Sequence, residues 1–161
     1  MAKATRGFPP VVDAGIEILI LGSFPSEKSI QAGEYYAFKQ NNFWHLVGEV
    51  IGQPLLPKMD YAERKRMLLK HHIGLWDVVG ACERKGSLDS NIRNRRDNDF
   101  SEVLGNARKL RLVAFNGKKA AEKEPIFKPR YQTVVLPSSS PANTMRFGEK
   151  LKQWRQIVSP H

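Results

Sequence analysis

Cysteine is nearly absent from this sequence of 161 residues. The only one, Cys82, excludes an internal disulfide, a four-cysteine zinc site and an iron–sulfur cluster held by cysteines alone. Histidine is scarce too, and its four positions (45, 71, 72 and 161) lack the spacing of a zinc-binding pair on one helix face. We therefore expect no metal and no cofactor, and we expect Cys82 to be a small core residue.

Long apolar runs are missing as well. The longest, Ile18–Leu21, falls far short of the ~20 residues that span a bilayer. The first ten residues contain Lys3 and Arg6 but no apolar stretch of the kind found in secretory signals. We expect a cytoplasmic protein, nucleoid-associated in a prokaryote, with no membrane partner.

Three common ligand-binding and nucleophile motifs are absent. The chain has no G-x-G-x-x-G dinucleotide fingerprint, no G-x-x-x-x-G-K-[ST] phosphate loop and no G-x-S-x-G nucleophile elbow. Gly117-Lys118 is followed by a second lysine and lacks the earlier glycine of a phosphate loop. Dinucleotide-dependent, P-loop and α/β-hydrolase chemistry are therefore unsupported.

Acidic residues are outnumbered by basic ones. Lysine and arginine total 26 against 16 aspartates and glutamates, so the formal net charge is +10. The basic residues are dispersed in short clusters, which argues against a disordered basic arm. This balance favours a polyanionic partner, with nucleic acid first and an anionic membrane surface second, although a soluble protein of high isoelectric point is the alternative.

Length and composition indicate one domain. At 161 residues, 41% hydrophobic and 26% charged, the chain is typical of a soluble globular protein. We expect a single domain over residues 1–161, with residues 1–8 as a flexible tail. We also expect a monomer, because there is no apolar heptad repeat or obvious sheet edge for self-association.

Short apolar runs bounded by turn residues alternate with helical patterns. Such runs are typical of strands buried on both faces of a parallel sheet. Strands are predicted at 16–21, 110–115 and 133–136, with 73–79 a weaker candidate. Helices are predicted at 43–51, 61–70 and 147–158, with a helical segment at 117–123 that stops before Pro125. The expected N-caps are Asn41 or Asn42, Asp60, and Asn143 or Thr144.

This alternation predicts an α/β sandwich with a parallel sheet, in which ligands bind at the carboxyl ends of the strands. Three polar loops fall at those ends, at residues 22–26, 116–117 and 138–141. We expect them to form one composite site. The alternative for each loop is that Gly, Pro, Ser and Asn are simply the ordinary residues of turns.

Residues 35–44 are dense in aromatic and amide side chains. Aromatic rings stack on nucleic acid bases, and an amide offers both a donor and an acceptor to a base edge. Phe43 and Trp44 fit the apolar face of the following helix and are expected in the core. Tyr35, Tyr36 and Asn41 precede that face, which makes them candidates for ligand contacts.

A set of short motifs in this order resembles the uracil-DNA glycosylase superfamily. The likeness is greatest to its hypoxanthine (deoxyinosine) DNA glycosylase branch, near the mismatch-specific uracil/thymine glycosylases. The motifs are LGSFPS at 21–26, YYA at 35–37, NNFW at 41–44, GLWDV at 74–78, FNGK at 115–118 and LPSSSPAN at 136–143. The resemblance implies a three-layer α/β/α sandwich around a short, mostly parallel four-stranded sheet.

The resemblance also implies roles for the matching residues. The catalytic positions are Asn41, Ser23 and Ser138. The base pocket is formed by Gly22, Phe24, Pro25, Asn116 and Tyr36, whose ring stacks on the extruded base. The DNA contacts come from Ser26, Ser139, Ser140, Pro141, Asn143 and Lys118.

Three positions depart from the family pattern. Phe24 stands where mismatch-specific relatives carry an Asn and the uracil enzymes an Asp that positions water. Ser138 stands where the strongest uracil enzymes carry a His, and Phe38-Lys39-Gln40 replaces a His-Pro-x segment. The first two departures weigh against robust uracil excision and favour a purine such as hypoxanthine, while the third is a change in the loop.

The resulting hypothesis is a monofunctional glycosylase of base excision repair. It would flip a deaminated base out of double- or single-stranded DNA and hydrolyse its N-glycosidic bond, leaving an abasic site. Hypoxanthine is the first substrate, with uracil and xanthine as further candidates. One alternative is a non-catalytic DNA-binding protein on the same fold. The other is a nucleoside or nucleotide hydrolase, which would not need the positive charge.

Overall fold

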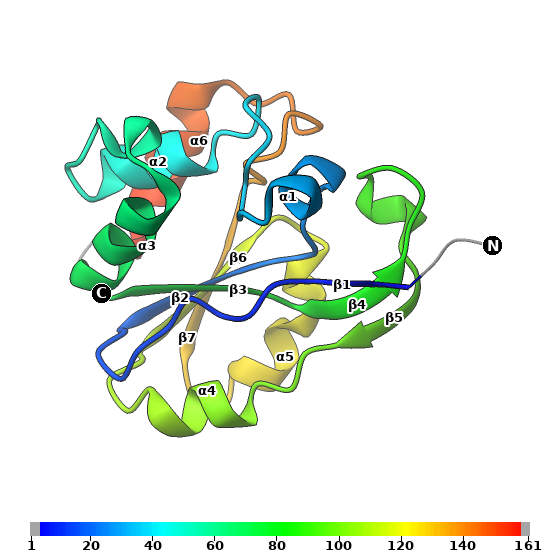
Figure 1. Cartoon of the computed structure of the whole chain (residues 1–161). Coiled ribbons are helices and arrows are strands. Elements are labelled where there is room, and N and C mark those ends of the chain that lie inside the picture. The colour runs from blue at the N-terminus through cyan, green and yellow to red at the C-terminus, as the bar shows by residue number, and fades with distance from the viewer. Residues whose placement is uncertain (1–3, 159–161) are drawn as a thin grey trace.

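A four-stranded parallel sheet lies at the centre of the structure, a computed structural model that describes residues 4–158 (Figure 1). The strand order is β3-β2-β6-β7, and each neighbouring pair is parallel. The bounds are β2 Ile18–Gly22, β3 Ile73–Asp77, β6 Leu112–Asn116 and β7 Gln132–Leu136. The strand of this sheet that comes first in the chain, β2, lies inside the sheet, so the strand order switches direction beside it. Such switch points open a crevice at the carboxyl edge.

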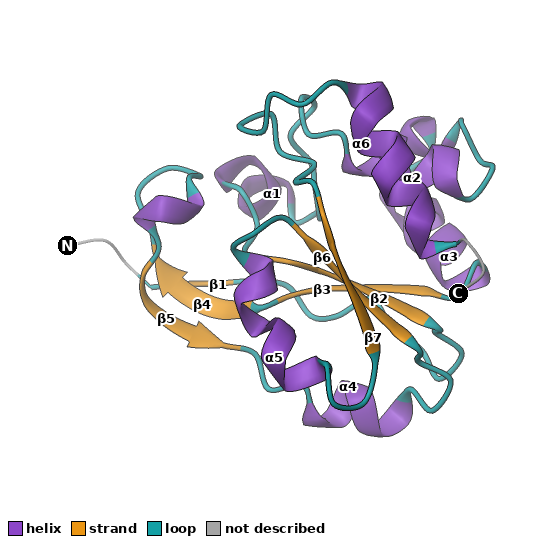
Figure 2. Cartoon of the chain, turned by 180° about the vertical axis from the view of Figure 1, so that it is seen from behind, coloured by secondary structure: helices purple, strands orange, loops and turns teal. Residues whose placement is uncertain are grey.

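Side chains of each strand alternate between the two faces of this sheet. Ile18 and Ile20 pack with α2 (Phe43–Val50), α3 (Tyr61–Lys70) and α6 (Phe147–Trp154). Leu19 and Leu21 pack with α4 (Ser101–Asn106), the 3₁₀-helix η3 (Ala120–Lys123) and α5 (Glu124–Phe127). Figure 2 shows helices on both sides of the sheet, which confirms the predicted three-layer α/β/α sandwich.

Several predicted element boundaries are confirmed. Asp60 caps α3, because its side chain accepts a hydrogen bond from the Glu63 amide at 2.9 Å. Helix α2 ends at Val50, and Gly52 follows with a φ of +73°, a backbone conformation that favours glycine. The weak strand candidate at 73–79 divides into β3 and the start of a strand in a second sheet.

The second sheet was not predicted. It is antiparallel, with the order β1-β4-β5, and joins β1 (Thr5–Arg6), β4 (Val79–Glu83) and β5 (Arg93–Asp97). Strand β5 reads RNRRD and is largely exposed, so it carries no apolar signal. Its pairing with β4 is interrupted by irregular register, which weakens any two-residue pattern further. The remaining short elements are α1 (Glu27–Ala32) and the 3₁₀-helices η1 (Leu56–Lys58), η2 (Asp89–Asn91) and η4 (Arg155–Ile157).

Two predictions about helix ends are wrong. The helical segment after β6 does not stop before Pro125, because a proline is tolerated in the first turn of α5, where its missing N–H has no intrahelical partner. Helix α6 begins after Arg146 and not after Asn143 or Thr144. Asn143 instead closes a local turn, since its Oδ1 accepts from the Met145 amide at 3.2 Å.

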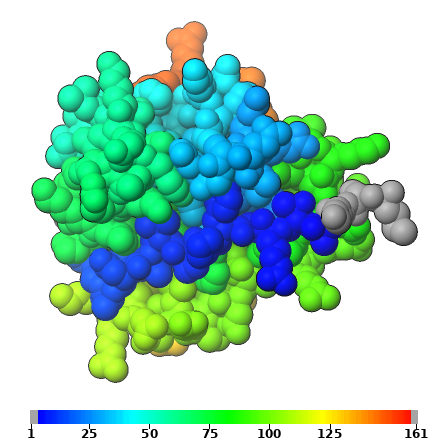
Figure 3. Space-filling view, in the orientation of Figure 1, coloured from blue at the N-terminus to red at the C-terminus, as the bar shows by residue number. Residues whose placement is uncertain are grey.

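Residues 4–8 are attached to the domain, contrary to the expected flexible tail; residues 1–3 lie outside the described part of the chain. Thr5 and Arg6 pair with β4, and the Phe8 ring meets the Tyr35 ring edge-on at 5.0 Å. The Trp76 Nε1 donates a hydrogen bond to the Phe8 carbonyl at 3.0 Å. Figure 3 shows this N-terminal segment in dark blue, lying across one face of the molecule.

Within residues 4–158, none of the helices combines the length and the apolar character needed to span a bilayer.

We predict that Trp154→Ala destabilises the fold by about 3–5 kcal/mol, as expected for a large aromatic side chain lost from a core. Trp154 is fully buried, meets the Phe43 ring edge-on at 5.8 Å, and donates from Nε1 to the Pro137 carbonyl at 2.9 Å. Phe147→Ala on the same helix is the matched control, because Phe147 is 38% exposed. It should cost less than about 1 kcal/mol. Urea unfolding measures both, and equal losses would contradict this assignment of the core.

Candidate active site

A cavity of about 90 Å³ opens at the carboxyl edge of the parallel sheet. On the same scale a single water needs only about 10–15 Å³, so the cavity can hold a larger ligand. As predicted, the three polar loops meet here. The lining includes residues 22–26 after β2, Tyr35, Tyr36, Phe38 and Asn41 before α2, Asp77 at the end of β3, Asn116 at the end of β6, and residues 138–140 after β7.

Asn116 fastens two of these segments together. Its Nδ2 donates to the Ser139 Oγ at 2.9 Å and to the Tyr36 Oη at 3.2 Å, and its Oδ1 accepts from the Ser139 amide at 2.9 Å. Both amide hydrogens are therefore committed to the protein, and the residue is only 8% exposed. This arrangement makes Asn116 a positioning residue in the cavity wall.

Tyr36 is held in a strained backbone conformation. Its φ of +54° lies in the left-handed region, which costs a non-glycine residue on the order of 1–3 kcal/mol. Its ring stacks on Phe43 with centroids 4.0 Å apart and planes 17° apart. Burial, followed by the charge of Asp77, raises the Tyr36 pKa, so this ring stays a neutral phenol. Tyr36 lines the cavity while one face of its ring is covered by Phe43.

Gly22 is required by the close approach of its neighbours. A Cβ at this position would lie 2.6 Å from Asp77 Oδ1 and 2.6 Å from Tyr36 Oη. Real Cβ atoms do not approach other atoms this closely, so any larger residue would displace both side chains. The absent side chain thus creates the space in which the carboxyl and the phenol face the cavity.

Asp77 was not among the residues predicted for the site. It ends β3 directly beside Gly22 in the register of the sheet and is 4% exposed. Among the described residues, nothing donates a hydrogen bond to its buried Oδ2. Burial and the nearby Asp89 carboxylate raise the Asp77 pKa from 3.8 to about 7, against a smaller opposing effect of Arg84. One signal could have revealed it, namely a single carboxylate in the otherwise apolar segment 73–79.

The loop after β2 is anchored on both sides. The Ser23 hydroxyl donates to Asp89 Oδ1 at 2.8 Å, and Ser26 caps α1 by accepting from the Ser29 amide at 3.2 Å. The Pro25 carbonyl accepts a hydrogen bond from the Arg84 guanidinium. These contacts hold the predicted catalytic Ser23 and the predicted DNA contact Ser26 at the rim of the cavity.

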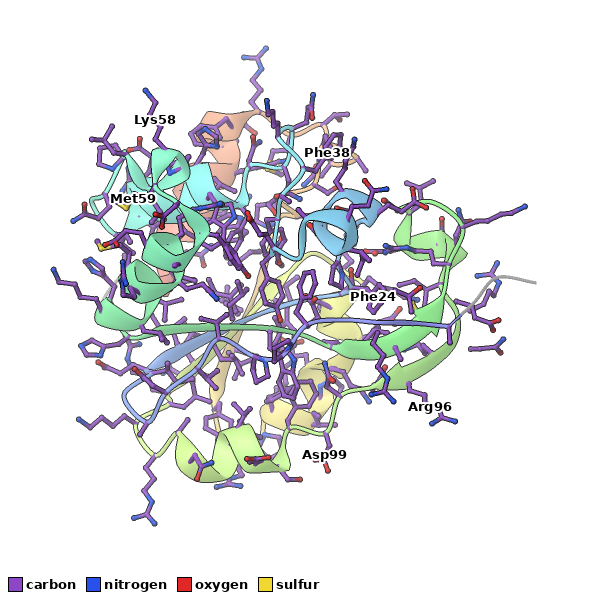
Figure 4. The ribbon with its side chains drawn as sticks, in the orientation of Figure 1. Phe24, Phe38, Lys58, Met59, Arg96 and Asp99 are labelled. Carbon is purple, nitrogen blue, oxygen red and sulfur yellow. The ribbon has the colours of Figure 1, made fainter. Side chains whose placement is uncertain are left out.

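Phe24 does not stand free in the cavity, although it contributes to the lining. Its ring is buried in a small cluster with Val79, Cys82 and Ile92, and the Arg84 guanidinium carbon lies 5.2 Å from the ring centroid. Figure 4 shows Phe24 between α1 and the β1-β4-β5 sheet. The predicted core role of Cys82 is confirmed, while Phe24 supplies no polar group that could orient water.

Asn41 lines the cavity and lies two residues before the first residue of α2. Its Oδ1 accepts from the Phe43 amide at 3.0 Å, whereas Asn42 occupies the N-cap position without a side-chain cap hydrogen bond. Within the described chain, no residue accepts a hydrogen bond from the Asn41 Nδ2. That amide is therefore available to a ligand or a water in the cavity.

The serine loop, residues 138–140, divides its side chains between the interior and the cavity. Ser139 is buried against Asn116, while Ser138 Oγ accepts from the Ser140 amide at 3.1 Å. The Ser140 carbonyl accepts from the Nζ of Lys150 at 3.3 Å. Burial lowers the pKa of Lys150. The loop is thus held from behind by α6.

A wider groove adjoins the cavity and carries the remaining predicted DNA contacts. It is lined by Lys118, Ser138, Ser140 and Asn143, and Pro141 is exposed beside it. Asn143 Nδ2 donates to the Ser138 carbonyl at 3.3 Å. Metal chemistry has no candidate ligands here, because no three His, Cys, Asp or Glu side chains in residues 4–158 are grouped to hold an ion.

The carboxyl edge of the sheet thus combines a cavity, a tyrosine ring in its lining and an adjoining groove that carries Lys118 and Lys119. The family model of the uracil DNA glycosylase superfamily matches residues 9–158. Two curated relatives carry the name hypoxanthine DNA glycosylase. One, from Methanosarcina acetivorans, is 46% identical over 94% of this chain and 96% of its own. The other, from Methanosarcina barkeri, is 43% identical over 94% of this chain and 96% of its own.

A solved structure agrees with the sequence comparisons. The solution NMR structure of a candidate uracil DNA glycosylase from Methanosarcina acetivorans matches with a TM-score of 0.87 and 46% identity, covering 96% of both chains. The chain belongs to the uracil DNA glycosylase superfamily. It is therefore a DNA glycosylase. The predicted family, fold and enzyme class are confirmed.

We predict that Asp77→Asn changes how stability depends on pH. In the unfolded chain the carboxyl ionises near 3.8, whereas in the folded protein its pKa is about 7. Between these values the folded protein keeps a proton that the unfolded chain loses. Wild-type stability should therefore fall with rising pH, by up to about 1.4 kcal/mol per pH unit, and level off above about pH 7.

The variant has no carboxyl to ionise, so its stability relative to wild type should rise from about pH 4 to about pH 7 and then stay constant. Urea unfolding of both proteins across this range measures the difference. A difference that does not change with pH would mean that Asp77 is ionised in the folded protein.

Proposed function

We propose that this protein is a monofunctional glycosylase that removes hypoxanthine from deoxyinosine in DNA and leaves an abasic site. Uracil and xanthine are further candidate substrates. The observation that carries the proposal is the cavity, which places the stacking ring of Tyr36 and the uncommitted amide of Asn41 at the sheet's carboxyl edge. The names of the two relatives, at 43% and 46% identity, support hypoxanthine as the first substrate.

In the proposed reaction the target nucleotide leaves the DNA stack and its base enters the cavity. Extrusion costs a few kcal/mol and is cheapest for a mispaired base, which favours deaminated bases. The base stacks on the face of Tyr36 that Phe43 does not cover. The backbone N–H groups of Ser23, Phe24 and Ser26 are the proposed donors to the charge that develops on the departing base, because preorganised donors stabilise such charge.

Asn41 orients the water that completes the reaction. Bond cleavage leaves a cationic sugar, which needs a well-placed water more than a strong base. The Asn41 side chain is fixed by its hydrogen bond to the Phe43 amide, so its Nδ2 has a defined direction. Phe24 supplies no water-positioning group, which is consistent with a purine-directed enzyme.

The remaining residues predicted for the site fall into two groups, those that position the loops and those proposed to contact DNA. Asn116 and Ser139 are committed to each other and position the loops. The proposed contacts to the DNA backbone are the exposed Lys118 and Pro141 and the groove residues Ser140 and Asn143. We propose that the enzyme works as a monomer in the compartment that holds genomic DNA, the cytoplasm or nucleoid of a prokaryote.

The proposal predicts that Asn41→Ala lowers hypoxanthine release about 10²–10³-fold, the usual effect of removing one preorganised polar group. Asn42→Ala is the matched control, because Asn42 does not line the cavity and makes no cap hydrogen bond. The measurement is single-turnover base release from a labelled duplex with one deoxyinosine, scored by alkaline cleavage. Tight binding without release would favour the non-catalytic alternative, and release from free deoxyinosine alone would favour a nucleoside hydrolase.

Binding should also depend on salt. Because the net charge is +10, we expect phosphate contacts that release counterions. The logarithm of the binding constant for duplex DNA should therefore fall linearly with the logarithm of the salt concentration. We predict that Lys118→Ala reduces this slope by about 1, the effect of one lost phosphate contact. Lys109→Ala, at an exposed position before β6 and away from the carboxyl edge, should leave the slope unchanged. Equal effects of the two variants would contradict DNA binding in the groove.

A further inference from the structure

One titratable side chain in the cavity has no part in the reaction described above. The Asp77 carboxyl lines the cavity and is 4% exposed. No lysine or arginine in residues 4–158 forms an ion pair with it, and its Oδ2 has no hydrogen-bond partner there. A buried polar atom without a partner costs free energy, so its presence in a cavity wall points to a ligand that supplies the partner.

The charged and titratable groups around Asp77 explain its protonation. Tyr35 and Tyr36 approach from the segment before α2, Tyr61 from α3, Arg84 from the loop after β4 and Asp89 from η2. Burial raises the pKa of each tyrosine, so all three are neutral near pH 7. Burial and Asp89 raise the pKa of Asp77 to about 7. Below about pH 7, Asp77 therefore carries a proton that it can donate.

The position of Asp77 relates it to the base and not to the sugar. Its Oδ1 and the Tyr36 Oη each lie 2.6 Å from the place a Gly22 Cβ would occupy, so both groups border the same small space. Asp77 is buried at the end of β3, whereas Ser23 and Asn41 are partly exposed. A flipped base enters such a cavity while its sugar and phosphates stay at the rim. The carboxyl thus faces an edge of the base.

We propose that Asp77 is the general acid of this enzyme and protonates the departing purine. The inference rests on the proposed function. The bond between C1′ and N9 breaks, and its electron pair goes to the purine ring. The Asp77 proton moves to a ring nitrogen with a free lone pair, N7 or N3, so the base leaves as neutral hypoxanthine. Water adds to C1′ and releases a proton, which returns the Asp77 carboxylate to its acid form.

This step supplies what a purine substrate demands. A purine that leaves without a proton carries a full negative charge, and the described residues that line this cavity include no lysine, arginine or histidine to neutralise it. Ring nitrogens of the purine accept a proton, and a carboxylic acid with a pKa near the working pH is an effective donor. The neutral, buried acid Asp77 thus takes the place of a cationic group beside the departing base.

The test compares wild type with Asp77→Asn in single-turnover hypoxanthine release from about pH 5 to pH 9. Asparagine preserves the shape but cannot transfer a proton, so the rate should fall about 10²–10⁴-fold, the usual contribution of general acid catalysis. The wild-type rate should be constant below about pH 7 and fall tenfold per pH unit above it, because the acid form is lost. The variant should show no such decline. Its affinity for the deoxyinosine duplex should equal that of wild type.

Asp89→Asn serves as the second variant. It keeps an oxygen to accept from Ser23 but removes the charge that raises the pKa of Asp77, so the decline should move to lower pH. If the wild-type protein releases hypoxanthine, two results would overturn the role of Asp77 and leave the proposed function standing. One is a release rate for Asp77→Asn within threefold of the wild-type rate. The other is a decline of the Asp77→Asn rate with rising pH that equals the wild-type decline. Absence of hypoxanthine release by the wild-type protein would overturn the proposed function, and the role of Asp77 with it.

Discussion

The register of the parallel sheet is the constraint on which the site depends. Strand β2 ends at Gly22, which pairs with Asp77, while Leu21 pairs with Phe115 and so places Asn116 beside the same edge. The ends of β2, β3 and β6 therefore bring Gly22, the Asp77 carboxyl and the Asn116 amide side by side at the carboxyl edge of the sheet. A shift of one residue in any strand would turn these side chains to the opposite face, since successive side chains alternate. The helices on both faces hold the register because the apolar residues of β2, β3 and β6 are buried against them.

The site is held together by hydrogen bonds, yet it is not built for maximum stability. Asn116 joins Tyr36 to the serine loop, and α6 supports that loop through Lys150 and Trp154. Tyr36 keeps an unfavourable φ, and Asp77 is buried without a charge partner. Strain and unpaired polar groups of this kind concentrate at functional sites, where the surrounding core maintains them. Here the aromatic cluster around Phe43 provides that support.

The residues predicted from sequence converge, but their side chains do not share one role. Asn41 and Ser23 line the cavity, where the Asn41 Oδ1 accepts from the Phe43 amide and the Ser23 hydroxyl donates to Asp89. Ser139, expected as a DNA contact, is buried, because its hydroxyl satisfies the amide of Asn116. A serine-rich loop has the same composition whether it points to phosphate or to an asparagine. The sequence therefore locates the loop and leaves the direction of each hydroxyl open.

The sequence by itself determined the parallel sheet, the main helices and the order of the polar loops, because apolar periodicity and turn residues are local properties. Even the family was readable, since its motifs are contiguous. Only the tertiary structure decided the second sheet, whose strand β5 has charged residues and no apolar pattern. It also decided the state of Asp77, because burial and the charge of Asp89 come from segments that are distant in the chain. The pKa of a carboxyl depends on what surrounds it in space, and that is set only when strands, loops and helices pack together.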